Sequence, residues 1–242
     1  MEYRKNDIVT LKIEDCGIDG EGIGKADGFT VFVKDAVIGD TVRAKIMKAK
    51  KNYGYGRLEE ILTPSPNRVE PECAFARQCG GCQLQALSYE KQLEFKTSKV
   101  RGHLERIGGF TDIPMEKILG MDQPFHYRNK AQFPVGKSKD GRIITGFYAG
   151  RTHSIIENRD CALGVTRNKE VLDRVIAHME KFHIQPYDEN TGKGLVRHVL
   201  IRYGFFTDEM MVCLIINGEK LPGEEALVKS LRQIPETVSV MV

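Results

Sequence analysis

The sequence predicts an α+β protein with a small five-stranded β-barrel first and a mixed α/β domain with a mostly antiparallel sheet after it. Three observations predict this. Short β-like segments separated by turns rich in Gly and Asp fill about the first 61 residues. Two closely spaced prolines then interrupt regular structure. From there to the end of the 242 residues, helical periodicities and β-hairpin patterns alternate.

Residues 1–61 are expected to form the barrel, because five short strands within about 60 residues are typical of an OB-like fold, which often binds oligonucleotides. The glycine-rich segment 17–25 predicts a β-hairpin rather than a phosphate-binding loop, since Lys25 is followed by Ala26 instead of Ser or Thr. The strands are expected from Ile8 to Ile13 and at 22–25, 29–33, 41–47 and 55–61.

Residues 63–68 are expected to be a linker, and a helix follows, with Ser88 as its N-cap and Gly108-Gly109 at its end. One stripe of this helix is apolar and must pack on another surface. The members of the stripe are Tyr89, Leu93, Val100, Leu104 and Ile107.

The rest of the chain predicts two hairpins, two helices and single strands. The hairpins lie at 126–148 and 195–216, the helices at 167–183 and 222–232, and the strands at 153–156 and 237–242. In the last strand, Val238, Val240 and Val242 alternate like a half-buried strand. Domains rarely end on such a strand, so we expect the natural polypeptide to continue beyond Val242.

Four cysteines carry the clearest chemical signal, three of them in a C-x5-C-x2-C pattern and one far downstream. Thiolates bind iron and zinc, and a cubane cluster accepts three ligands from one loop and one from elsewhere. Structural zinc more often uses two short pairs of ligands, so the spacing favours a cluster over zinc, and either over inert thiols. Gly80 and Gly81 would let the backbone turn tightly and direct N–H groups at the sulfurs. The four are Cys73, Cys79, Cys82 and Cys161.

Cys16 and Cys213 stand apart from these four. We expect Cys16 at a turn and Cys213 as a small apolar residue in a buried strand.

The formal net charge is only +3, but two runs of basic residues, from Arg43 to Arg57 and from Arg128 to Arg151, are interleaved with aromatic side chains. One such run alone would indicate an ordinary solvated face. Two runs with aromatic residues favour nucleic-acid binding, because cations neutralise phosphates and aromatic rings stack on unpaired bases. The candidate contacts are Lys48, Lys50, Lys51, Tyr53, Arg128 and Lys130. His126 and His153 border the second run and suit structural roles equally well.

No apolar run is long enough to cross a membrane, and the N-terminus has no secretory signal. We therefore expect a cytoplasmic location and no membrane partner.

Together these features resemble the N-terminal half of bacterial 23S rRNA (uracil-5-)-methyltransferases. That family places a TRAM β-barrel first, then the C-x5-C-x2-C motif, a Tyr-Arg-x-Lys strand and a remote fourth cysteine. The counterparts here are residues 1–61, the three clustered cysteines, Tyr127-Arg128-Asn129-Lys130 and Cys161, and the resemblance covers essentially the whole chain.

The resemblance implies that the four cysteines hold a [4Fe–4S] cluster and that a monomeric enzyme methylates RNA with S-adenosyl-L-methionine. In the family reaction a cysteine thiolate adds to C6 of a flipped-out uridine, and C5 then takes the methyl group. The family's tRNA-directed branch generally lacks both barrel and cluster, so 23S rRNA is the expected substrate. Residues 62–87 and 118–242 would form the central RNA-binding domain, and 88–117 would pack on a Rossmann-like catalytic domain.

That catalytic domain has no counterpart in the 242 residues, so we expect no catalytic or S-adenosylmethionine-binding residues in this chain, which should be inactive alone. A stand-alone iron–sulfur RNA-binding module is the alternative. A radical S-adenosylmethionine enzyme is disfavoured, because such enzymes use C-x3-C-x2-C and leave one iron without a protein ligand.

Overall fold

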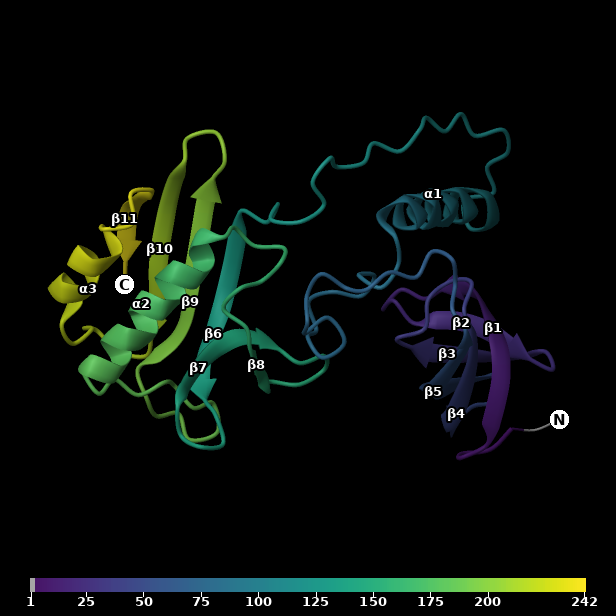
Figure 1. Ribbon diagram of the computed structural model, residues 1–242, viewed down its shortest axis with the longest axis horizontal. Coiled ribbons are helices and arrows are strands. Elements are labelled where there is room, and N and C mark those ends of the chain that lie inside the picture. The colour runs from purple at the N-terminus through teal and green to yellow at the C-terminus, as the bar shows by residue number, and fades with distance from the viewer. Residues whose placement is uncertain (1–2) are drawn as a thin grey trace. The chain divides into compact units, whose positions relative to one another are not determined.

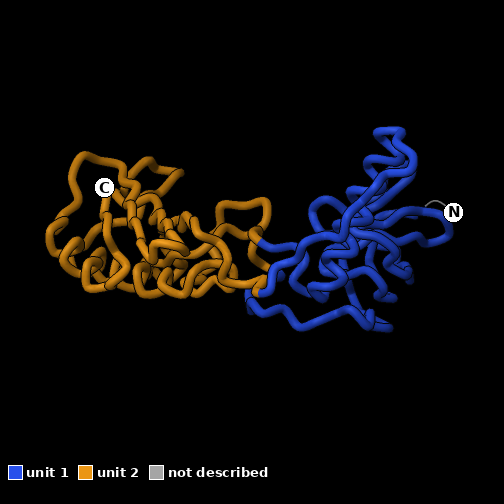
Figure 2. The backbone as a smooth tube through the Cα atoms, turned by 90° about the horizontal axis from the view of Figure 1, so that it is seen from above, with its two compact units in different colours: residues 1–77, 82–122 blue, residues 78–81, 123–242 orange. Residues whose placement is uncertain are grey.

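The computed structural model describes residues 3–242, which divide into two compact units (Figure 2). The first unit contains residues 1–77 and 82–122, and the second contains residues 78–81 and 123–242. The first unit thus groups 62–77 and 82–122 with the barrel. The assignment of 62–87 and 118–242 to a central RNA-binding domain stays a prediction. No helix among the described residues is long and apolar enough to span a membrane.

The first unit is built on a closed five-stranded barrel with strand order β1-β2-β3-β5-β4 (Figure 1). Its interior is filled by alternating apolar side chains such as Ile13, Val31 and Ile46, which are almost completely buried. The predicted barrel is thus confirmed, and the segment after β1 is the expected hairpin. The strands are β1 (Ile8–Cys16), β2 (Gly22–Ala26), β3 (Phe29–Lys34), β4 (Thr41–Ala49) and β5 (Tyr53–Thr63).

The segment predicted as a linker is fixed to the barrel by the carboxylate of Asp40, whose side chain is fully buried. The backbone N–H of Ser65 donates to Asp40 Oδ1 at 2.9 Å, and Arg68 Nη2 donates to Oδ2 at 2.6 Å. Burial alone would raise the pKa of Asp40, but hydrogen bonds from Arg68, Ser65 and Val37 outweigh it and hold the pKa below its usual range. The chain after β5 is therefore part of the barrel's structure.

Helix α1 (Tyr89–Arg106) begins and ends as expected from its capping residues. Ser88 accepts a hydrogen bond from the N–H of Lys91 at 3.4 Å, and Gly109, at φ +69°, follows the last turn. None of its residues is buried, and Val100 in the predicted apolar stripe is 52% exposed. Packing of this stripe on a further domain stays a prediction.

The second unit contains a six-stranded sheet with strand order β11-β10-β9-β6-β7-β8, antiparallel except for the β10–β11 pair (Figure 1). The predicted hairpins and final strand are present. The strands are β6 (Lys130–Lys137), β7 (Ile143–Tyr148), β8 (Ile155–Glu157), β9 (Val196–Gly204), β10 (Glu209–Ile216) and β11 (Thr237–Met241).

Helices α2 (Arg167–Lys181) and α3 (Glu224–Leu231) supply apolar side chains to a core on one face of this sheet. Leu172 and Met179 of α2 and Leu231 of α3 meet Phe133 of β6 and Val212 of β10 in that core, and all five are buried. Because side chains alternate along a strand, the opposite face carries a different set. That set includes Lys130, Gln132, Leu200, Arg202, Met211, Cys213 and Ile215.

Two expectations need correction. Cys16 is the last residue of β1 and is buried rather than lying in a turn. Cys213 is only half-buried, because it lies on the sheet face opposite the core. In β11, Val240 packs against the core, whereas Val238 is 59% exposed.

Candidate nucleic-acid interface

The first cluster of candidate residues lies at the end of β4 and in the turn to β5, and its side chains are exposed. Lys48, Lys50 and Lys51 are exposed, and Tyr53, the first residue of β5, is 38% exposed. The N–H of Lys50 donates to the carbonyl of Tyr53 at 2.8 Å, which closes the turn. Within the described part of the chain, none of the three lysines has an acidic partner, so their charges are available to an anion.

The two arginines that bound this basic run are engaged elsewhere. Arg43 pairs with Glu60, and Arg57 donates to Glu59 through Nη2 at 2.7 Å. Both pairs are partly solvated, so each contributes little to stability. The usable positive charge is therefore concentrated on the lysines of the run.

The second cluster centres on Lys130, the first residue of β6. The register pairs Lys130 directly with Arg202 of β9, a residue that the sequence analysis did not single out. Like charges opposite each other on antiparallel strands repel, and neither has an ion-pair partner among residues 3–242. Lys130 and Arg202 also line a shallow cavity of about 340 Å³ with Asn129 and Thr207, so an anion could contact both side chains.

Arg128 lies outside the strand on which it was expected. It precedes β6, forms a β-bridge with Gly164, and donates its backbone N–H to the carbonyl of Leu163 at 2.8 Å. Its side chain is nevertheless exposed. Arg128 thus remains a possible phosphate contact, although from a loop rather than from the same strand face as Lys130.

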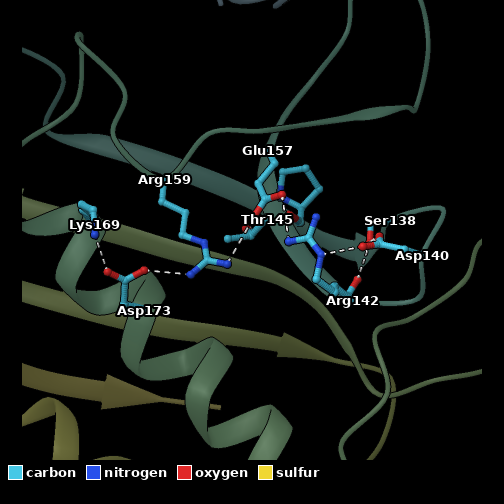
Figure 3. A network of polar contacts seen from close by, with 9 residues as sticks. Ser138, Asp140, Arg142, Thr145, Glu157, Arg159, Lys169 and Asp173 are labelled. Atoms are coloured by element: carbon cyan, nitrogen blue, oxygen red, sulfur yellow. Dashed lines mark hydrogen bonds and ion pairs between the residues drawn. The ribbon is translucent and has the colours of Figure 1, made fainter.

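Arg142 of the second basic run and Arg159 after it belong to a chain of ion pairs in the second unit (Figure 3). Arg142 bonds Asp140 at 2.8 Å and approaches Glu157 at 3.6 Å. Hydrogen bonds from Ser138 and Arg142 lower the pKa of Asp140 to about 2. Arg159 continues the chain from Glu157 to Asp173 of α2. These arginines are held by carboxylates, which leaves Lys130 and Arg202 as the stronger candidates.

The two histidines near this run have partners that suit structural roles. His126, at φ +55°, places Nδ1 2.9 Å from the carbonyl oxygen of Gly164. The His153 ring stacks on Tyr148 with centroids 5.0 Å apart, and its Nδ1 lies 2.5 Å from Glu189. Both contacts restrict the rings, so neither histidine is taken as a contact to RNA.

The four cysteines of the predicted cluster are divided between the units, with Cys73 and Cys82 in the first and Cys79 and Cys161 in the second. All four are half-buried. Within residues 3–242, no group of three or more potential ligands is arranged to hold a metal ion. The predicted cluster is therefore not confirmed.

The surroundings of the Cys79 thiol nevertheless suit a thiolate-ligated group. The N–H of Gly81 points at Cys79 Sγ over 3.4 Å, as expected for the Gly-Gly pair, and such a bond stabilises negative charge on sulfur. Gly80 donates to the carbonyl of Tyr148 at 3.0 Å, and a Cβ there would lie 3.1 Å from Gly150 Cα. The Gly-Gly pair thus allows the close approach of two backbone segments beside Cys79.

The remaining cysteines offer no nucleophile. Burial raises the pKa of the Cys16 thiol to about 11, so the reactive thiolate form is scarce at neutral pH. Cys213 lies in the middle of β10, and residues on both sides of it are paired with β9. The expectation that neither acts in catalysis is consistent with these positions.

Residues 4–58 match the TRAM domain family. A protein of Clostridium tetani named as an uncharacterized RNA methyltransferase is 43% identical over 238 residues, which is 98% of this chain and 51% of that protein. A protein of Halalkalibacterium halodurans with the same description is 42% identical, over 98% of this chain and 52% of its own length.

One solved structure also matches the fold. It is a Pyrococcus abyssi tRNA (uracil-54, C5)-methyltransferase in complex with S-adenosyl-L-homocysteine, with a TM-score of 0.64 and 25% identity. The match covers 90% of this chain and 48% of that one. The chain thus spans about half the length of the relatives that it matches, and it is similar over nearly all of its own length to one part of RNA methyltransferases.

Proposed function

We propose that this chain is the RNA-recognition portion of an S-adenosylmethionine-dependent RNA (uracil-5-)-methyltransferase, acting on 23S rRNA in the cytoplasm as a monomer. The observation that carries the proposal is the similarity of 98% of the chain to about half of proteins named RNA methyltransferases. The two clusters of unpaired cations support it, because phosphate contacts supply most of the affinity of proteins for RNA.

In this proposal the chain's own residues bind and orient RNA. The lysines of the β4–β5 turn would contact one stretch of phosphates, and Lys130 with Arg202 would contact another. S-adenosylmethionine would supply the methyl group on a part of the enzyme outside these 242 residues. The chain alone would therefore bind RNA without methylating it.

RNA binding is tested by fluorescence anisotropy with fragments of unmodified 23S rRNA at several salt concentrations. We expect the logarithm of the affinity to fall linearly with the logarithm of salt, by roughly 0.7 per phosphate neutralised on a single strand. An affinity that does not change between low and moderate salt would contradict the assignment of the cationic clusters. Incubation with labelled S-adenosylmethionine should give no incorporation, and incorporation above blank would show that the chain is catalytic.

A tRNA substrate is the second candidate, and a specific observation favours it. The tRNA enzyme of Pyrococcus abyssi matches 90% of this chain, so the unmatched tenth is too small to contain the whole barrel. The barrel is therefore weaker evidence for ribosomal RNA than the resemblance implied. Competition between unmodified tRNA and 23S rRNA fragments for the chain distinguishes the two substrates.

We further propose that Cys73, Cys79, Cys82 and Cys161 hold a [4Fe–4S] cluster, which would organise the RNA-binding portion rather than carry out redox chemistry. The donor set and the Gly81 N–H support this. Anaerobic quantification of iron and sulfide tests it, with about four of each expected per chain. A stand-alone iron–sulfur RNA-binding protein is the alternative, and a stop codon directly after Val242 in the gene would favour it.

A further inference from the structure

An aromatic cluster lies on the outside of the barrel and is not explained by the stability of the fold. The rings of Phe32, Tyr53 and Tyr55 contact one another, with centroid distances of 5.8 Å between Phe32 and Tyr53, 5.6 Å between Phe32 and Tyr55, and 5.8 Å between the two tyrosines. Tyr53 is 38% and Tyr55 40% exposed. Neither tyrosine hydroxyl has a hydrogen-bond partner in the described part of the chain.

In the first part of β5, large side chains face outward and small ones face inward, which is the opposite of the arrangement that stabilises a barrel. Its large aromatic residues, Tyr53 and Tyr55, point outward, whereas the inward positions between and after them are the buried glycines Gly54 and Gly56. A Cβ at Gly54 would lie 3.0 Å from the ring of Phe29, so the interior has no room for larger side chains there. Amphipathic strands normally bury the apolar side chains and expose the small or polar ones. The outward tyrosines therefore need another explanation.

The strand register sets this cluster beside a row of cations. Phe32 of β3, Tyr55 of β5 and Lys48 of β4 are direct cross-strand partners and form one row. Two residues further along β3 and β5, on the same outer face, Lys34 and Arg57 form the next row. Lys45 of β4 completes this row, three residues before Lys48, because the β4 register is irregular between Ile46 and Lys48. The rows are about 6.6 Å apart, which is two residues of a strand.

Three cations in one cross-strand row repel one another. Glu59 offsets Arg57, and Lys34 Nζ donates to the carbonyl of Arg77 at 3.3 Å, but neither Lys34 nor Lys45 has a carboxylate partner among residues 3–242. This arrangement is favourable when an anion lies over the row. Aromatic faces next to a line of phosphate-binding cations are the combination by which proteins hold single-stranded nucleic acid.

We propose that Phe32, Tyr53 and Tyr55 form a stacking platform for unpaired RNA bases, while Lys34, Lys45 and Lys48 hold the adjoining phosphates. This inference rests on the proposed RNA-binding function and narrows it to a single-stranded segment bound on the β3–β5–β4 face of the barrel. In a duplex the bases are stacked on one another and the platform cannot reach them, so base-paired RNA engages the cations alone.

Binding of three probes to the whole chain tests the platform. The probes are an unstructured oligoribonucleotide of about twelve nucleotides, an abasic chain of the same length, and a duplex. Tyr55→Leu keeps apolar volume but removes the ring, and it should weaken binding of the unstructured RNA about tenfold. It should leave the affinity for the abasic chain and the duplex unchanged. Tyr55→Phe keeps the ring and should bind like the wild type.

Phe206→Leu is the matched control, because Phe206 is a fully exposed aromatic residue outside the barrel. It should not change the affinity for any probe. Equal binding of unstructured RNA by Tyr55→Leu and wild type would overturn the platform while leaving RNA binding intact. Absence of binding by the wild type would instead overturn the proposed function and the platform with it.

A second measurement does not depend on affinity. The chain has no tryptophan, so Tyr55→Trp introduces a single reporter on the platform. Its fluorescence should be quenched by the unstructured RNA and unaffected by the abasic chain at saturation. Phe206→Trp should show no quenching with either probe. Quenching of Tyr55→Trp by the abasic chain to the same extent would exclude base stacking as the cause.

Discussion

The buried carboxylate of Asp40 predicts the largest stability effect of any single polar substitution in the barrel. Asp40 accepts from the N–H groups of Val37 and Ser65, each at 2.9 Å, and from Arg68 through Nε and Nη2. Asp40→Asn keeps the size of the side chain but removes its charge, so the guanidinium of Arg68 loses its counter-charge. The side chain of Arg68 is 21% exposed, against 0% for Asp40.

The expected loss of stability is roughly 3 kcal/mol. Breaking a buried ion pair by removing one partner costs about 3–5 kcal/mol, and the partial access of water to Arg68 places this pair at the lower end. The exposed pair of Arg43 and Glu60 is the control, since both of its side chains are about half exposed. Glu60→Gln should cost less than about 1 kcal/mol.

Hydrogen exchange is the suitable assay, because two units need not unfold together and a single denaturation curve would mix them. The amides of β1 and β4 should lose protection by a factor of about 100 or more in Asp40→Asn, which corresponds to roughly 3 kcal/mol. Adding Arg68→Met to Asp40→Asn should recover part of the loss, because no unpaired charge remains. A loss below about 1 kcal/mol in the single variant would refute the reasoning.

Three further predictions concern acid stability, the cysteines and the second cationic cluster. The pKa of Asp40 is lower in the folded state, so its contribution to the free energy of unfolding is fully present above the ordinary carboxyl pKa of about 4 and is lost as pH falls through the folded-state pKa. The barrel amides should therefore lose protection from hydrogen exchange below about pH 4, and not between pH 5 and 8. Cys161→Ser should lower the iron and sulfide content of anaerobically prepared protein, whereas Cys213→Ser should not change it; equal content in both variants would contradict the proposed ligand set. Lys130→Gln and Arg202→Gln should each reduce the salt dependence of RNA affinity by about one phosphate contact, and unchanged slopes in titrations at several salt concentrations would remove this pair from the interface.

The barrel could be predicted from the sequence because the patterns that indicate it involve residues close together in the chain. Inward positions alternate with outward ones, and Gly-containing turns separate the strands. The limits of β5 were placed too narrowly, since the strand runs from Tyr53 to Thr63 and is paired with β4 through irregular register. Bulges of that kind depend on both strands, so the sequence of one strand does not reveal them.

The contacts of Asp40 and Arg202 could not be predicted, because they join residues that are far apart in the sequence. Asp40 precedes β4, where an aspartate usually indicates a turn, yet it bonds Ser65, which is 25 residues away. Arg202 became a candidate RNA contact only because it pairs with Lys130, and the sequence alone does not determine the register between β6 and β9. The cysteine motif was visible as a spacing, but spacing does not determine how four thiols are arranged in space.

The β-bridge between Cys79 and Ala149 has a consequence for the order of events during translation. The 70 residues that separate the two positions take the ribosome roughly 4 to 14 seconds to add. Strand β5 is complete before Cys79 is made, so the barrel can close while the Cys79 loop still awaits the strand that will position it. Any insertion of a metal group that requires the finished loop must wait until Ala149 has been made, by which time the barrel can already have closed.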